Sequence, residues 1–183
     1  MKRKIFTVIG LVAAALGVYL FAVSGESNEP KESETQNIKE LVHDYSVGNI
    51  KNESASITSQ QLIVTDSGES QLTYDLPEDE FFVSIAPYVE KTHPCAVHSL
   101  TGCRGEMVGE EFSVYIEDTE GNLILDQTLK SQSNGFIDLW VPRDKAYRVT
   151  IAHDGKTVES EFSTFESDNT CITTMQLTEN KNA

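Results

Sequence analysis

The spacing of hydrophobic and polar positions changes along the chain and divides it into segments. The first segment has a basic N-terminus followed by Ile5–Val23, which contains no charged residue. This pattern is typical of an export signal or an N-terminal membrane anchor. We assign residues 1–24 to a signal peptide or membrane anchor, with residues 5–23 as the membrane tether if it is not cleaved. Either assignment places residues 25–183 outside the cytoplasm, in the periplasm or at the cell surface, because the basic residues stay inside.

The next segment, residues 25–37, contains no large apolar residue, which predicts a flexible acidic tether. Helical spacing of apolar residues follows, at Ile38, Leu41, Val42 and Tyr45. Asn37 precedes them and is a suitable N-cap. We therefore expect a helix that opens a region over residues 38–86, and this region also contains strands.

From residue 61 onward, apolar and polar residues alternate in short runs. Strands are predicted at Gln61–Thr65, Gln71–Leu76, Glu80–Ala86, Glu111–Glu117, Leu123–Thr128, Gly135–Val141, Tyr147–Ala152, Thr157–Phe162 and Thr170–Leu177. Asp154-Gly155 is a strong signal for a tight hairpin turn. Frequent short strands with turn signals favour an antiparallel β-sandwich over residues 87–183. The expected fold is mainly β with a small N-terminal helical part (α+β).

A stretch within this region has a more particular pattern. In residues 121–155, a glycine-led strand ends at Pro142 and is followed by a tyrosine strand and the Asp-Gly hairpin. This order resembles small transthyretin-like sandwich modules. The resemblance supports the expected sandwich fold.

The charge of the chain excludes some classes of partner. With 14 basic and 29 acidic residues, the chain has a net charge of −15 at pH 7. Such a surface repels nucleic acid, so we expect no nucleic-acid partner. The sequence also has no glycine-rich phosphate loop, no Gly-x-Ser-x-Gly elbow and no His-Glu-x-x-His helix, so nothing indicates a hydrolase.

Candidate chemistry is concentrated in residues 92–109, which contain several glycines and a proline and predict a loop. This segment carries Cys95 and Cys103, and the third cysteine, Cys171, lies in the last predicted strand. In an oxidising compartment an odd number of thiols leaves at least one outside any intrachain disulfide. The seven residues between Cys95 and Cys103 fit neither a Cys-x-x-Cys redox motif nor a zinc knuckle, which also requires a fourth nearby ligand.

These residues suggest a copper site. Soft thiolates favour Cu(I), which accepts few ligands. His93 and His98 flank Cys95 and are candidate nitrogen ligands, so the candidate metal site is Cys95, Cys103, Cys171, His98 and His93. Oxidation of two thiols to a disulfide releases two electrons, enough to reduce two Cu(II) ions to Cu(I).

The same segments carry a family resemblance. They are Phe82–Val89, Thr92–His98, Thr101–Glu106 and Asn169–Cys171. Over residues 38–178 the chain resembles the CueP-type periplasmic copper-binding proteins. The resemblance implies an exported protein that binds copper for copper resistance and reduces Cu(II) to Cu(I). It also implies copper supply to an extracytoplasmic Cu,Zn superoxide dismutase and a homodimer formed through the N-terminal half.

The residues alone leave two other interpretations open. One is a cell-surface β-sandwich binding module without metal, in which one pair of the three cysteines forms a stapling disulfide. The other is a thiol oxidoreductase acting on proteins, although the Cys-x-x-Cys motif and a thioredoxin-like βαβ pattern are missing. The family resemblance favours the copper-binding interpretation.

Overall fold

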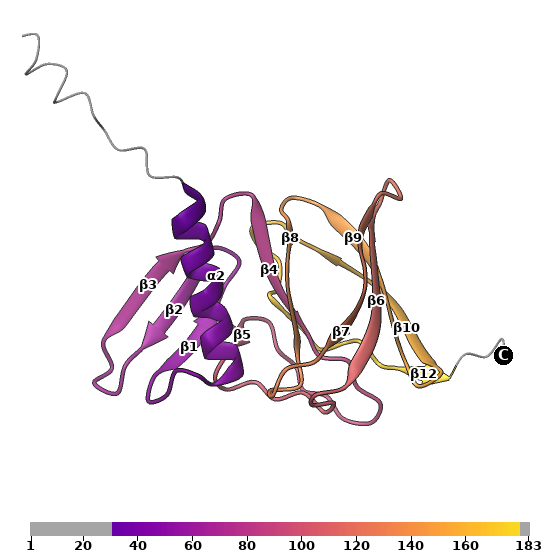
Figure 1. The fold of residues 1–183 in the computed structure, drawn as a ribbon, viewed down its shortest axis with the longest axis horizontal. Helices are drawn as coiled ribbons and strands as arrows, with labels where there is room; N and C mark the ends of the chain where they lie inside the picture. Colours follow the sequence, from indigo (N-terminus) through magenta and orange to yellow (C-terminus); the bar gives the residue numbers. More distant parts are fainter. Residues whose placement is uncertain (1–30, 180–183) are drawn as a thin grey trace, which may run out of the picture. The chain divides into compact units, whose positions relative to one another are not determined.

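Strands dominate the part of the chain that the computed structural model describes, residues 31–179 (Figure 1). The elements are α2 (Lys31–Val47), β1 (Ser54–Ile57), β2 (Gln61–Thr65), β3 (Gln71–Asp75), β4 (Glu80–Ile85), β5 (His98–Ser99), β6 (Glu111–Asp118), β7 (Leu123–Lys130), β8 (Ile137–Pro142), β9 (Ala146–His153), β10 (Lys156–Ser163), β11 (Cys171–Ile172) and β12 (Thr178–Glu179). The prediction of a mainly β fold with a small helical part is confirmed. The expected signal or anchor, residues 1–24, lies outside the described residues. Within residues 31–179, no helix is long and apolar enough to cross a membrane.

Helix α2 begins earlier than the sequence pattern predicts. Its first residue is Lys31, so Asn37 is an interior residue and not the N-cap. Lys, Glu and Gln are good helix formers, and a helix can extend through such residues without burying an apolar face. The end at Gly48 is as expected, because this glycine has a φ of 79° and follows the last helical turn. The Asn49 N–H donates to the Asp44 carbonyl oxygen at 2.9 Å, which caps the helix in a Schellman motif.

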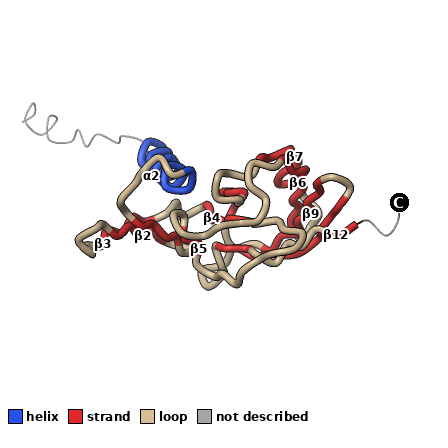
Figure 2. The backbone as a smooth tube through the Cα atoms, turned by 90° about the horizontal axis from the view of Figure 1, so that it is seen from below, coloured by secondary structure: helices blue, strands red, loops and turns tan. Residues whose placement is uncertain are grey.

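The helix packs on a four-stranded antiparallel sheet with the strand order β3-β2-β1-β5. Figure 2 shows α2 on one side of these strands. Ile38, Val42 and Tyr45 of the helix form a buried cluster with apolar residues that include Ile57 and Leu62 of the sheet. The helical spacing read from the sequence therefore marks the buried face of α2.

The remaining strands form a five-stranded sheet, β12-β10-β9-β6-β7, and a three-stranded sheet, β11-β4-β8. One buried cluster joins the two sheets, with Phe81 and Ile85 of β4 packed among Val114 of β6 and Val149 of β9. The hairpin between β9 and β10 turns at Asp154 and Gly155, whose positive φ angles of 47° and 77° fit the predicted tight turn.

Strand β4 takes part in both halves of the fold. It pairs antiparallel with β8 and parallel with β11, and its side chains are buried on both faces. Phe82 belongs to the helix-side cluster, whereas its neighbours Phe81 and Val83 belong to the cluster between the sheets. Strand β5 links the cysteine segment to the four-stranded sheet, because His98 pairs with Ile57 of β1. The residues from Thr35 onward accordingly form one compact unit.

The last predicted strand, Thr170–Leu177, is mostly irregular. Only Cys171–Ile172 forms a strand, and Gln176 adds an isolated bridge to Tyr88. The predicted alternation still holds for burial, since Cys171, Thr173, Met175 and Leu177 are all buried. Strands β1, β5 and β12 were not predicted; β5 and β12 have only two residues each, too few for a periodic signal.

Candidate metal centre

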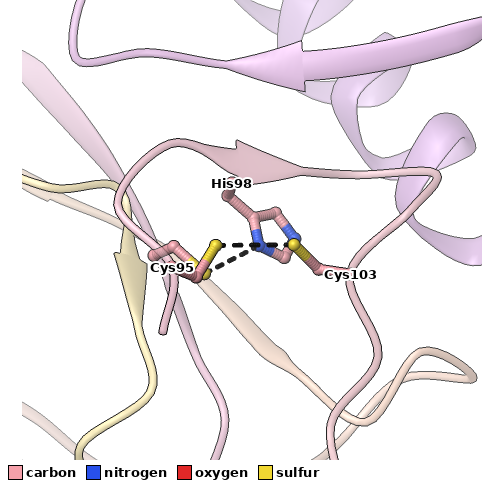
Figure 3. Close-up of side chains that lie close together, drawn as sticks. Cys95, His98 and Cys103 are labelled. Carbon is pink, nitrogen blue, oxygen red and sulfur yellow. Dashed lines mark hydrogen bonds between the residues drawn. The ribbon is translucent and has the colours of Figure 1, made fainter. Parts of the chain in front are cut away.

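Four side chains converge at one point, three from residues 95–103 and one from β11. The ligand atoms of Cys95, His98, Cys103 and Cys171 all lie within 4.8 Å of one another. The sulfurs of Cys95 and Cys103 are 3.5 Å apart, and His98 Nδ1 is 3.4 Å from the Cys171 sulfur. Figure 3 shows Cys95, His98 and Cys103 pointing toward a common centre.

Backbone hydrogen bonds hold Cys103 in position. The N–H of Cys103 donates to the Ser99 carbonyl oxygen at 2.9 Å, which closes the turn that follows β5. Two residues later, Gly105 donates to the Asn134 carbonyl oxygen at 2.7 Å and lies directly against Gly135. A Cβ atom on Gly105 would be 2.4 Å from the Gly135 carbonyl oxygen, so only glycine allows this approach.

The remote residue Cys171 is brought to the site by strand pairing. It lies on β11 opposite Ser84 of β4, and its N–H donates to the Ala96 carbonyl oxygen at 3.2 Å. The Thr170 hydroxyl accepts from the His98 N–H at 3.0 Å and donates to the Ile57 carbonyl oxygen at 2.6 Å. These contacts tie β11 to the cysteine segment and to β1.

The four ligand residues differ in burial. His98 and Cys171 are almost fully buried, with 0% and 2% of their surface exposed, whereas Cys95 and Cys103 are half-buried. Phe136 packs against the His98 ring with centroids 4.5 Å apart, and Ala86 and Phe136 form an apolar cluster with Cys171. The centre therefore has a closed apolar side and a side that solvent can reach.

Hydrogen bonding among the thiols shifts their pKa values in opposite directions. The pKa of Cys103 lies far below the usual range of a thiol, chiefly because Cys171 hydrogen-bonds to its thiolate. The interaction with Cys103, together with burial, raises the pKa of Cys171, and burial raises the pKa of Cys95. One thiolate at Cys103 thus lies beside two thiols that remain protonated.

His93 is outside the cluster of four ligand atoms. Its ring packs edge-on against Phe136 with centroids 6.3 Å apart, and a hydrogen bond from His93 helps to lower the pKa of Cys103. The structure therefore brings four of the five predicted site residues together and places His93 next to one of them.

The residues behind His98 were not predicted from the sequence. The Ser84 hydroxyl lies 3.3 Å from His98 Nε2 and donates to Asp138 Oδ1 at 2.5 Å. Asp138 Oδ2 in turn accepts a hydrogen bond from Ser46 of α2. The one available signal was a serine in the middle of the apolar run Phe81–Ala86, since a buried hydroxyl needs a partner.

The donor set fits a soft metal. Thiolate sulfur and imidazole nitrogen are ligands of Cu(I) and of Zn²⁺. The expectation that zinc would lack a fourth nearby ligand is wrong, because His98 and Cys171 complete a set of four with Cys95 and Cys103. The three cysteines, all within the described residues, are free, and no disulfide staples the fold here.

Comparison with known proteins identifies the family. A search of curated proteins found no match. The solved structure described as "Crystal Structure of S.CueP" aligns with a TM-score of 0.73 and 32% sequence identity, covering 87% of this chain and 96% of that one. The family profile described as "Periplasmic copper-binding protein CueP" matches residues 37–176. The chain therefore belongs to the CueP family of periplasmic copper-binding proteins.

Proposed function

We propose that this protein binds Cu(I) outside the cytoplasm through Cys95, Cys103, Cys171 and His98. The observation that carries this proposal is the convergence of their four ligand atoms within 4.8 Å. Copper is the metal of the family, and thiolates are the ligands that Cu(I) prefers over water or carboxylate. His93, which lies beside Cys103, is proposed as a ligand that joins when metal is bound.

Competition with a chromogenic Cu(I) chelator under reducing, anaerobic conditions tests this function. The wild type should remove Cu(I) from the chelator, and the triple Cys→Ser variant should not. His153→Gln is a matched control, because His153 lies on the far β9–β10 hairpin. Equal affinity in the triple variant would refute the site. A preference for Zn²⁺ over Cu(I) in the same assay would refute the choice of metal.

We propose further that the protein reduces Cu(II). The half-buried thiols of Cys95 and Cys103, 3.5 Å apart, are the pair that would be oxidised. Forming one disulfide from the Cys95 thiol and the Cys103 thiolate releases one proton and two electrons, and each electron converts one Cu(II) to Cu(I). Cys171 and His98 are not consumed by this step and remain to hold one Cu(I) product.

Anaerobic addition of Cu(II) to the reduced protein tests the reduction. Two thiols should be lost for every two Cu(I) ions formed, and peptide mapping should place the disulfide between Cys95 and Cys103. Cys95→Ser should abolish the disulfide while leaving thiols at the other two positions. Formation of Cu(I) without thiol loss would exclude the protein's thiols as the electron source.

Delivery of Cu(I) to an exported Cu,Zn superoxide dismutase is the proposed fate of the metal. It is supported by the open side of the centre, where Cys95 and Cys103 are accessible to ligands of a second protein. Incubating the Cu(I)-loaded protein with copper-free dismutase should restore dismutase activity faster than the same amount of copper–glutathione complex. An equal rate from both copper sources would refute specific delivery.

A homodimer formed through the N-terminal half is proposed from the edge of the four-stranded sheet. All residues of β3, the edge strand, are exposed, including Leu72 (60%) and Tyr74 (39%). An open edge with apolar side chains favours pairing with a second strand. Light scattering should give the mass of a dimer for the wild type and of a monomer for Leu72→Glu; a monomeric wild type would refute the dimer.

Residues 1–24 keep their proposed role as a signal peptide or a membrane anchor. Both roles agree with the periplasmic location of the family. The mass of the protein recovered from cells distinguishes them: cleavage after Ser24 gives a shortened soluble chain, and an intact N-terminus recovered with membranes gives an anchor.

A further inference from the structure

A line of polar side chains, buried except for the half-buried Asp138, lies behind His98. His98 and Ser84 are both fully buried, and His98 Nε2 is 3.3 Å from the Ser84 hydroxyl. Ser84 hydrogen-bonds to Asp138, its antiparallel partner on β8, at 2.5 Å. The other ring nitrogen, Nδ1, points at the thiols, 3.4 Å from the Cys171 sulfur.

The number of protons on Ser84 and His98 decides which group is the donor in each of these hydrogen bonds. A serine hydroxyl has one proton, and Ser84 donates it to the Asp138 carboxylate. Its oxygen can then only accept from His98, so the Nε2 atom must carry a hydrogen. A neutral imidazole has a single N–H, and its other nitrogen has a free lone pair. That lone pair is therefore on Nδ1, the atom that faces the three thiols.

The Asp138 carboxylate is held from a second side. Ser46, near the end of α2 and 3% exposed, donates to Asp138 Oδ2. With Ser84 on Oδ1, both carboxylate oxygens have a hydroxyl donor, which fixes the carboxylate plane. These hydrogen bonds thus connect α2, through Asp138 on β8 and Ser84 on β4, to His98 on β5.

We propose that Asp138 and Ser84 are positioning residues that keep the proton of His98 on Nε2 and present Nδ1 as a metal ligand. Neither residue touches the metal in this assignment; they act through the ring of His98. Hydrogen bonds to the far nitrogen of a ligating histidine fix its tautomer and orientation and raise its basicity. The role as a ligand for Cu(I) rests on the proposed function, whereas the tautomer is a property of the metal-free protein.

Nitrogen-15 NMR of the His98 ring tests the tautomer without copper. In the reduced, metal-free wild type at alkaline pH, we expect the proton on Nε2. Asp138→Leu retains bulk but removes the acceptor, so Ser84 should donate to Nε2 and drive the proton to Nδ1. Ser84→Ala removes the acceptor for Nε2–H and should leave a mixture of tautomers. Ser46→Ala is the matched control: it takes one hydrogen bond from the same carboxylate but leaves the Ser84–His98 contact, so the tautomer should not change.

Affinity for Cu(I) gives an independent readout. Loss of an outer-shell partner typically weakens metal binding roughly 10–100-fold, and we expect this for Ser84→Ala and Asp138→Leu but not for Ser46→Ala. A wild-type proton on Nδ1, or an Nε2 proton unchanged in every variant that folds, would overturn the proposal. If the wild type binds no Cu(I), the proposed function fails but the tautomer result stands. If the variants bind Cu(I) as tightly as the wild type, the positioning role fails and the copper site stands.

Discussion

The two sides of the metal centre are built differently. Cys171 and His98 lie on short strands, β11 and β5, that pair with β4 and β1, and both residues are almost fully buried. Cys95 and Cys103 lie on irregular backbone between prolines and glycines and are half-buried. A ligand fixed by sheet pairing loses little conformational entropy on binding a metal, whereas a ligand on irregular backbone can move during exchange. Under the proposed function, the buried side would retain the metal and the open side would be where metal and electrons enter and leave.

The largest expected effect comes from removing the buried sulfur. Cys171→Ser should weaken Cu(I) binding by more than the roughly 100-fold that loss of an outer-shell partner can cause, because it removes a ligand itself. Cys95→Ser, on the open side, should weaken binding less. Chelator competition with both variants measures the difference. A greater loss for Cys95→Ser would reverse the assigned roles of the two sides.

A change of one hydroxyl should damage the buried side without touching a ligand. Thr170→Val keeps the shape of the side chain but leaves the His98 N–H and the Ile57 carbonyl without their partner. An unpaired buried polar group costs about 1–3 kcal/mol, so the free energy of unfolding should fall by that amount. Urea denaturation measures it. The exposed Thr178→Val serves as the control and should leave stability nearly unchanged.

The open side should respond to Gly105→Ala. The added Cβ would lie 2.4 Å from the Gly135 carbonyl oxygen, so the backbone beside Cys103 has to shift. Overpacking of this kind costs about 1–3 kcal/mol of stability, and a displaced Cys103 should also weaken Cu(I) binding. Gly121→Ala is the control, because no atom lies within 4 Å of the added Cβ. The φ of 84° at this position is strained for alanine. This control should lose stability but keep its affinity for Cu(I).

The smallest effect concerns the rate of thiol modification. The lowered pKa of Cys103 keeps it a thiolate as the pH falls below about 8.5, the usual pKa of a thiol. The raised pKa values of Cys95 and Cys171 keep those two thiols protonated. Since the thiolate is the reactive form, iodoacetamide at pH 6 should modify Cys103 first. Cys171 should stay unmodified until the protein unfolds, because it is buried. Mass spectrometry of tryptic peptides checks the order, and faster labelling of Cys95 at pH 6 would contradict it.

The periodic strands were predictable because their signals are local. The runs for β2, β6 and β9 are found within one or two residues of their predicted ends. The early start of α2 was missed since its polar first turns have no apolar spacing. The role of β4 in both cores was also missed. A run such as Phe81–Ile85, buried on both faces, does not reveal which strands lie beside it.

The sequence by itself determined the mainly β fold, the Asp154–Gly155 turn and the placement of Cys95 and Cys103 in one short segment. Each of these depends on neighbours within about ten residues, where backbone preference and chain length restrict the geometry. Only the tertiary structure decided that Cys171 meets His98, because their contact depends on the parallel pairing of β11 with β4. The line from Ser46 through Asp138 and Ser84 to His98 likewise joins four elements distant in sequence. Such contacts follow from how the sheets pack together, and no local pattern of residues encodes them.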